Sequence, residues 1–145
     1  MVFAWIAVIA AGLFAGAALY ITLVEHPARI ECGIDIAVAE FRPSYRRASV
    51  MQASLAVIGL LAGIAAWVSL QQIALLIGAL LLGAVIPFTL IVIRPTNKQL
   101  LSPTRNVSAP AAAVLLAQWQ RLHAVRTILS LAAFGLLVWC VLSVE

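Results

Sequence analysis

Charged residues are scarce in this sequence, and their scarcity excludes most classes of soluble protein. Asp, Glu, Lys and Arg make up 10% of the 145 residues, whereas 65% are hydrophobic. A soluble domain has roughly 25% charged residues and about 45–50% apolar ones. A water-soluble fold of this size cannot bury so much apolar surface, because small domains leave a large share of their surface exposed. The composition therefore excludes a soluble enzyme, a disordered chain and, despite an isoelectric point near 9.8, a nucleic-acid-binding protein.

Three long stretches, residues 1–24, 48–93 and 127–144, have no charged side chain. A helix needs about 20 apolar residues to cross the hydrocarbon core of a bilayer. The first and third stretches are each long enough for one span, and the middle stretch is long enough for two. Its polar cluster at 69–72 marks the turn between them. We therefore predict an all-α fold, a single domain over residues 1–145 built as a bundle of four transmembrane helices, with spans near 2–24, 48–68, 73–93 and 124–143.

The positive charges lie on one side of these spans. All nine Lys and Arg residues fall in the links 25–47 and 94–123, or at Arg126 just inside the fourth span. The two ends of the chain and the turn at 69–72 have none. Because Lys and Arg are enriched in cytoplasmic loops, we predict that both links are cytoplasmic and that both termini lie outside the cytoplasm.

Cysteine is also rare. The two cysteines, Cys32 and Cys140, form no C-x-x-C motif, so the chain lacks the dithiol of a disulfide-shuttling membrane oxidoreductase. The predicted topology places Cys32 in the first cytoplasmic link and Cys140 near the outer end of the fourth span. We therefore expect no disulfide between them.

The two links are predicted to contain further helix. Apolar residues recur at helical spacing in 28–41, which indicates a short amphipathic helix lying at the membrane interface. Pro43 is then expected in the first turn of the second helix. Ser108-Ala109-Pro110 is typical of a helix start. The fourth helix is therefore predicted to be long, beginning about 14 residues, or roughly 20 Å, before the membrane.

Small residues and one proline characterise the spans themselves. Gly12-x-x-x-Gly16 and Gly59-x-x-x-Gly63 allow membrane helices to approach closely. We interpret both motifs as packing within the bundle rather than as a dimer interface, because four spans must first pack on one another. Pro87 removes a backbone N–H group and is predicted to kink the third span.

Side chains suited to chemistry gather at the predicted cytoplasmic ends of the spans. Span one ends with Glu25 and His26. Trp119, His123 and Arg126 lie at positions i, i+4 and i+7 at the start of span four, so they share one helix face. Because the first and last helices of an up-and-down bundle can be neighbours, we expect the two histidines to lie close together.

Arg94 and Arg126 stand at the ends of otherwise uncharged spans. A charge buried in a membrane is costly and is usually paired or functional. Glu25 is a candidate counter-charge for these arginines, although it could instead pair with Arg29 four residues later. Most of the other basic residues are interpreted most simply as ligands of lipid headgroups: Arg29, Arg42, Arg46, Arg47 and Lys98.

Four short motifs are distributed from residue 18 to residue 126: A-L-Y-x-x-L-V-E-H-P-A-R at 18–29, R-P-S-Y-R-R at 42–47, P-x-x-L-x-x-I-x-P-T-N-x-x-L at 87–100 and W-x-x-L-H-x-x-R at 119–126. In this order and spacing the sequence resembles the anthrone-oxygenase-like family of small four-helix membrane proteins. Fungal members of that family are implicated in oxidising anthrones to anthraquinones with molecular oxygen and no recognised cofactor. The resemblance implies a multi-pass protein, here of a bacterial inner membrane, and directs attention to His26, Asn97, Trp119, His123 and Arg126.

The first functional hypothesis is a cofactor-independent oxygenase that acts on a lipophilic phenolic or polyketide-like ring. A histidine would remove a proton from an acidic ring carbon, and an arginine would stabilise the resulting enolate oxygen. Its partners would be membrane lipids, the lipophilic substrate and molecular oxygen, with no nucleic acid. The candidate catalytic residues are His26, His123, Arg126 and Arg94, and the candidate substrate-binding residues are Glu25, Asn97, Trp119 and Tyr45.

Two other functions stay open. One is a non-enzymatic membrane protein that binds a lipid or hydrophobic ligand or assists another complex. In that case Trp119 would be an interfacial anchor and the histidines would be structural. The other, which is less favoured, is a metal or haem protein ligated by His26 and His123, with Glu25 as a further candidate ligand. The first hypothesis requires no cofactor, and we expect none.

Overall fold

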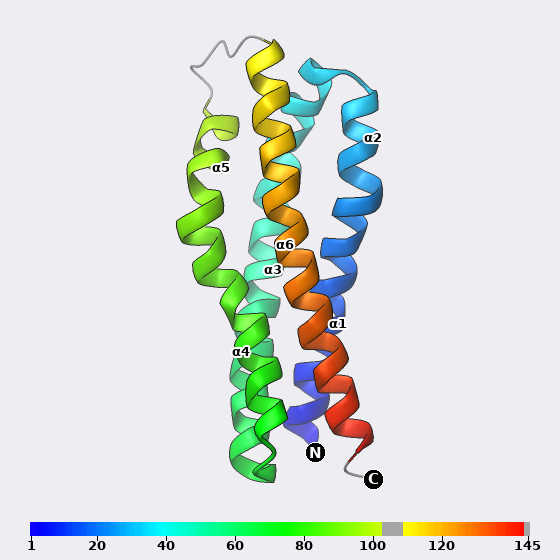
Figure 1. The fold of residues 1–145 in the computed structure, drawn as a ribbon, viewed down its shortest axis with the longest axis vertical. Helices are drawn as coiled ribbons and strands as arrows, with labels where there is room; N and C mark the ends of the chain where they lie inside the picture. The colour runs from blue at the N-terminus through cyan, green and yellow to red at the C-terminus, as the bar shows by residue number, and fades with distance from the viewer. Residues whose placement is uncertain (103–108, 144–145) are drawn as a thin grey trace.

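The computed structural model describes residues 1–102 and 109–143, and every regular element within them is helical (Figure 1). These elements join end to end into four long helices. The first and third helices each contain a π-helical turn. In chain order the elements are α1 (Val2–Tyr20), η1 (Ile21–Glu25), α2 (His26–Glu31), α3 (Ile34–Leu70), α4 (Ile73–Phe88), η2 (Thr89–Ile93), α5 (Arg94–Leu101) and α6 (Ala109–Leu142).

All four long helices can cross a membrane by length and composition. Their most apolar segments have mean hydropathies from 2.1 to 2.7, and large apolar side chains such as Leu61, Ile91 and Trp139 are exposed on the outside. The chain is therefore a multi-pass membrane protein with the predicted four-helix architecture. The predicted turn at 69–72 joins α3 to α4, and Gln71 adopts the left-handed backbone conformation there (φ 54°).

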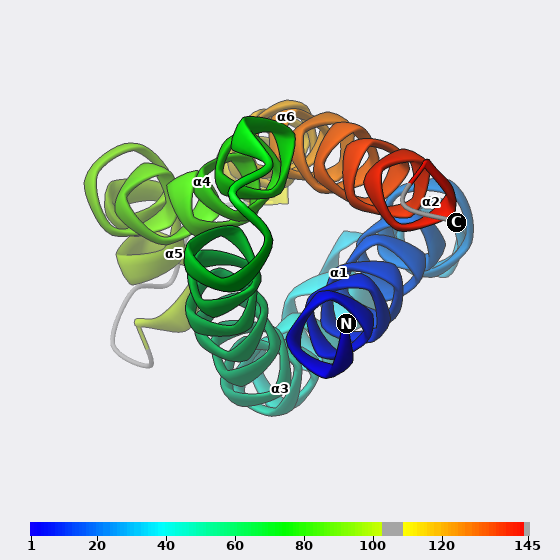
Figure 2. The ribbon, with the colours of Figure 1, turned by 90° about the horizontal axis from the view of Figure 1, so that it is seen from below.

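The helices form an up-and-down bundle around an alanine-rich core. α1 packs against α3 and α6, and α4 packs against the same two helices, so the first and last helices are neighbours (Figure 2). Small core residues allow the close helix approach that drives packing in lipid. The larger side chains of the main core include Phe14, Leu75, Leu82 and Leu137.

Three of the four glycines in the small-residue motifs pack against neighbouring helices of the bundle. A Cβ atom added at Gly12, Gly59 or Gly63 would collide with a side chain of a neighbouring helix. The contact at Gly63 is the hardest to relieve, because the added atom would lie 2.5 Å from Ala79 Cβ and 3.4 Å from Ala79 Cα. Gly16 faces open space and takes no part in this packing.

The segment 28–41 is not the single short helix that the sequence predicts. Its helical part is interrupted at Cys32 and Gly33, where Gly33 has φ 100°, and Ile34 already begins α3. Pro43 consequently lies inside α3 rather than in its first turn. The sequence predicts that the second long helix begins at Pro43, whereas it begins directly after Gly33, because glycine lacks a Cβ and tolerates positive φ. The position of this segment at the membrane surface stays a prediction.

The third and fourth helices follow the predictions for them. Pro87 lies near the end of α4, and η2 follows at once. Proline and π-helical turns are both causes of bending, and α5 is displaced to one side of the bundle (Figures 1 and 2). α6 is long as expected, beginning at Ala109, whereas Ser108 and Arg105 lie outside the described residues.

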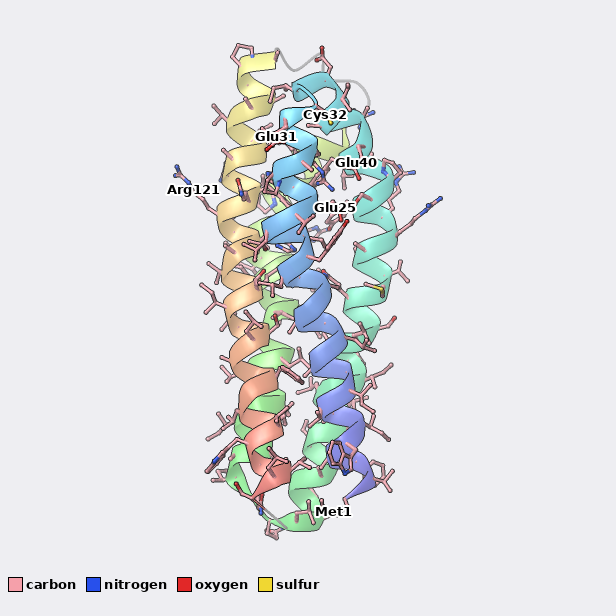
Figure 3. The ribbon with its side chains drawn as sticks, turned by 90° about the vertical axis from the view of Figure 1, so that its right-hand side faces the viewer. Met1, Glu25, Glu31, Cys32, Glu40 and Arg121 are labelled. Carbon is pink, nitrogen blue, oxygen red and sulfur yellow. The ribbon has the colours of Figure 1, made fainter. Side chains whose placement is uncertain are left out.

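The charged residues lie toward one end of the bundle. Figure 3 shows Glu25, Glu31 and Arg121 in that half and Met1 at the opposite end. The start of α1, the end of α6 and the α3–α4 turn share the end of Met1 (Figure 1). Cys32 is exposed and Cys140 is buried, and both are free thiols, as expected. Which end faces the cytoplasm stays a prediction.

Candidate functional site

Trp119 lies between the two histidines of the protein. Its ring centroid is 4.7 Å from that of His123 and 5.3 Å from that of His26. Phe41 closes the group, with its ring nearly perpendicular to that of Trp119 and the two ring centroids 5.1 Å apart. His26, Trp119 and His123, hereafter the ring stack, join α2 to α6. This contact confirms the prediction that the two histidines are close together.

Hydrogen bonds orient the imidazole of His123. Thr22 Oγ1 lies 3.1 Å from His123 Nδ1 and 2.9 Å from the carbonyl oxygen of Ala18. A hydroxyl has one proton, so when Thr22 donates to Ala18 it accepts the proton of His123 Nδ1. In that arrangement Nε2 of His123 has a free lone pair and can act as a base.

His26 differs from His123 in its environment. The residue is 1% exposed, and neither of its ring nitrogens has a hydrogen-bond partner. The imidazole of His26 instead packs against the ring of Trp119. His26 therefore has the environment of a packing residue, whereas the imidazole of His123 is held by a hydrogen bond.

Arg126 is buried without an acidic partner among the described residues. It is 8% exposed, donates a 2.9 Å hydrogen bond to Gln52 Oε1, and lies over the ring of Phe14 at 5.5 Å. Its Nε atom has no partner. The predicted pairing of Glu25 with Arg126 or Arg94 is wrong, because Glu25 pairs with Arg29.

A polar network around Arg29 accounts for Glu25. Arg29 forms ion pairs with Glu25 and Glu40, and Ser44 donates a hydrogen bond to Glu25. Arg29 also lies over the ring of Phe41 at 5.6 Å. The network links α2 to α3 across the break at Gly33. Arg29 is therefore a buried structural cation and not the lipid-headgroup ligand that the sequence suggested.

Most of the other basic residues are exposed, and one of them is held by a hydrogen bond. Arg46, Arg47 and Lys98 are exposed, which fits contact with headgroups, whereas Arg42 donates a 2.8 Å hydrogen bond to the carbonyl oxygen of Ser102. Arg94 is exposed as well. The structure therefore does not bring Arg94 into the group of candidate site residues.

Asn97 and Tyr45 form a second polar contact beside the ring stack. Asn97 Nδ2 donates a 2.9 Å hydrogen bond to the hydroxyl oxygen of Tyr45. Asn97 is 3% exposed, and its Oδ1 atom has no partner. The predicted site residues Tyr45 and Asn97 thus lie together, on α3 and α5.

Two adjoining cavities lie between these side chains. A small one of about 20 Å³, here called the polar cavity, includes Glu25, Trp119 and His123 in its lining. A larger one of about 170 Å³, here called the lateral cavity, lies between α3 and the α4–η2 helix, with Phe14 on its wall. Four residues line both cavities: Tyr45, Ser49, Gln52 and Arg126.

The arrangement supplies the parts of an acid–base site. A space of about 10–15 Å³ can hold one water molecule, so the polar cavity can place a water next to His123. The lateral cavity is large enough for part of a lipophilic molecule. Arg126 lies on the shared wall, where it can stabilise negative charge on oxygen. Among the described residues, no three His, Cys, Asp or Glu side chains are placed to hold a metal ion.

Sequence reasoning missed Gln52 and Thr22. Gln52 is 2% exposed and is the hydrogen-bond partner of Arg126. The available signal was a lone amide inside an uncharged span, since polar residues in membrane helices usually face the bundle interior. Thr22 gave no comparable signal, because threonines in membrane helices commonly bond their own backbone, as Thr22 does with Ala18.

Comparison with known proteins identifies a family. The family model for anthrone oxygenase matches residues 41–136, a range that contains Tyr45, Gln52, Trp119, His123 and Arg126. No curated protein matches the chain, and no solved structure does. Because the matched range covers more than half of the sequence, the chain belongs to the anthrone oxygenase family.

Proposed function

We propose that this protein is a cofactor-independent oxygenase that acts on a lipophilic phenolic or polyketide-like ring. The observation that carries the proposal is the buried guanidinium of Arg126, which has no carboxylate partner among the described residues. A buried ion of this kind is costly and is typically functional. It lines both cavities, one helical turn from His123.

The chemistry begins with proton removal. A ring methylene group conjugated with a ketone is acidic, because its conjugate base is an enolate. His123 Nε2 can accept this proton directly or through one water molecule. Arg126 stabilises the enolate oxygen as its charge develops. The proposed roles of His123 and Arg126 are thus base and oxyanion stabiliser.

Oxygen then serves as the oxidant. The electron-rich enolate carbon reduces O2 and forms a bond to one of its oxygen atoms, while the second oxygen atom leaves as water. The methylene group and O2 together yield a carbonyl group and H2O, so atoms and electrons balance. Membrane lipids, the lipophilic ring and molecular oxygen are the partners that this reaction requires.

We also propose that the protein lies in a bacterial inner membrane with both termini outside the cytoplasm. All described Lys and Arg residues lie toward the same end of the bundle, in the links 25–47 and 94–123 or at Arg126. The positive-inside rule predicts that this end of the bundle faces the cytoplasm. The substrate would then react near the cytoplasmic surface of the bilayer.

Oxygen uptake by the purified protein tests the function. With an anthrone as substrate, we expect turnover by the unmodified protein and a loss of about 10²–10³-fold in kcat for Arg126→Gln, the usual effect of removing one oxyanion donor. Arg121→Gln is the matched control, because Arg121 is an exposed arginine on the same helix. Equal activity in the two variants would refute the role of Arg126. Binding of the anthrone without oxygen uptake would favour a non-enzymatic ligand-binding protein.

A further inference from the structure

Gln52 has a hydrogen-bond donor that no protein group accepts. Its Oε1 atom accepts the bond from Arg126. A guanidinium group has no acceptor, so this bond determines which way the amide is oriented. The Nε2 atom of Gln52 is then left as a donor, and it has no partner although the residue is 2% exposed. A buried donor without an acceptor is unfavourable, and a ligand oxygen would satisfy it.

Two more donors lie on the same wall. Arg126 Nε is buried and has no partner. The hydroxyl oxygen of Tyr45 accepts a hydrogen bond from Asn97, which leaves the hydroxyl proton of Tyr45 available to another acceptor. Gln52, Arg126 and Tyr45 all line the lateral cavity, and no carboxylate does so. The wall is therefore complementary to an oxygen atom that carries negative charge.

The remaining lining of the lateral cavity is mainly apolar. Phe14 and Val85 contribute to it from α1 and α4. Its rim includes Ala53 of α3 and Leu90 of η2, both of which are exposed. Both rim residues belong to the uncharged stretch 48–93, so the opening faces the hydrocarbon of the bilayer.

We propose that the lateral cavity binds an apolar ring compound that enters from the bilayer between α3 and η2 and places its ketone or enolate oxygen against Gln52, Arg126 and Tyr45. The aromatic walls formed by Phe14 and Tyr45 favour a ring over an alkyl chain. This inference rests on the proposed oxygenase function for the identity of the ligand. It adds Gln52 as a binding residue and names the route by which the ligand arrives.

Binding measured without oxygen tests the role of Gln52. Anthrone is equilibrated under nitrogen with the full-length protein in detergent micelles, so that no turnover occurs. Gln52→Glu places a carboxylate beside Arg126 and opposes an anionic oxygen, so we expect at least tenfold weaker binding, and a smaller loss for Gln52→Met. Ser54→Ala is the control, since Ser54 is an exposed residue of α3 that lines neither cavity. Unchanged binding in Gln52→Glu overturns the assignment.

The route is tested at the rim. Ala53→Trp and Leu90→Trp should each slow anthrone association at least tenfold, whereas Val57→Trp, one turn further along the exposed face of α3, should not. These positions are exposed, so the bundle has room for the larger ring, and circular dichroism checks that each variant is folded. Equal association rates in all three variants overturn the lateral route.

Two further outcomes separate the ligand and the function. Oleate offers an anionic oxygen on an alkyl chain, and tighter, Gln52-dependent binding of oleate than of anthrone overturns the assignment to a ring compound. Gln52-dependent anthrone binding without any oxygen uptake refutes the oxygenase and supports the site. If the protein takes up oxygen and Gln52→Glu leaves the affinity for anthrone unchanged, the oxygenase function is supported and the proposed binding site is overturned.

Discussion

Arg126 has the most demanding environment of the described side chains. Its positive charge is buried inside the bundle. Transfer of an ion from water into a protein interior costs on the order of several kcal/mol of free energy. The ring of Phe14 and the amide of Gln52 offset part of this cost. No carboxylate among the described residues does so. A residue kept under these conditions is well suited to bind an anion.

The two histidines should differ in their contributions to catalysis. His123 lines the polar cavity and is oriented by Thr22, whereas His26 lines neither cavity and has no hydrogen-bond partner. We expect His123→Gln to lower kcat by about 10²–10⁴-fold, the usual contribution of a general base. His26→Phe preserves the ring contact with Trp119 and should lower kcat far less, with no loss of thermal stability. Oxygen-uptake kinetics and thermal unfolding of both variants make the comparison, and a larger kcat loss in His26→Phe would reverse the assignment.

At the level of the helices, the site lies where regular α-helix is interrupted. η1 directly precedes His26, and η2 directly follows α4 beside the lateral cavity. π-Helical turns are frequent at functional sites because they rotate the following residues relative to a regular helix. Here the two turns lie on the first and third helices, on opposite sides of the bundle. Ile21 and Glu25 of η1 line the polar cavity, and Thr89 and Leu90 of η2 line the lateral cavity.

Helix packing depends on glycine at the α3–α4 contact. A methyl group at Gly63 meets the backbone of Ala79 as well as its side chain, so α3 and α4 must separate. We expect Gly63→Ala to destabilise the bundle by about 1–3 kcal/mol, as overpacking does. Gly16→Ala is the control, because nothing lies within 4 Å of the added atom. Thermal unfolding in detergent measures both, and equal unfolding temperatures would contradict a packing role for Gly63.

At the level of the whole molecule, charge is separated along the bundle axis. The described parts of the charged links lie toward one end, and the α3–α4 turn, the start of α1 and the end of α6 lie at the other (Figures 1 and 3). Such an asymmetry sets the orientation of a multi-pass protein. In the proposed topology the polar cavity lies near the cytoplasmic membrane surface and the lateral cavity opens toward the lipid.

Thiol labelling in cells tests the orientation. Cys32 is exposed and lies in the link predicted to be cytoplasmic. A membrane-impermeant maleimide should therefore label it only after the cells are opened. Ser69→Cys, in a Cys32→Ser background, should be labelled in intact cells, because Ser69 is exposed near the α3–α4 turn. The opposite labelling pattern would invert the topology.

Much of the architecture could be predicted because lipid leaves few alternatives. In hydrocarbon every backbone polar group must be satisfied within the segment, so a long uncharged stretch becomes a helix. The same argument does not locate a helix boundary in a charged link, so the sequence predicts a helix start at Pro43, whereas the boundary lies at Gly33. Helical spacing likewise placed Trp119 and His123 on one face, but it cannot say which residues of other helices that face meets.

The sequence by itself determined the four spans, the charged end of the bundle and the shared face of Trp119, His123 and Arg126. Only the tertiary structure decided that Glu25 pairs with Arg29, that Arg94 stays outside the site and that Gln52 binds Arg126. The physical reason is that the rotation and axial register of whole helices determine which side chains lie next to a given charge. Contacts between small residues of different helices set both, and those contacts exist only after the bundle has packed.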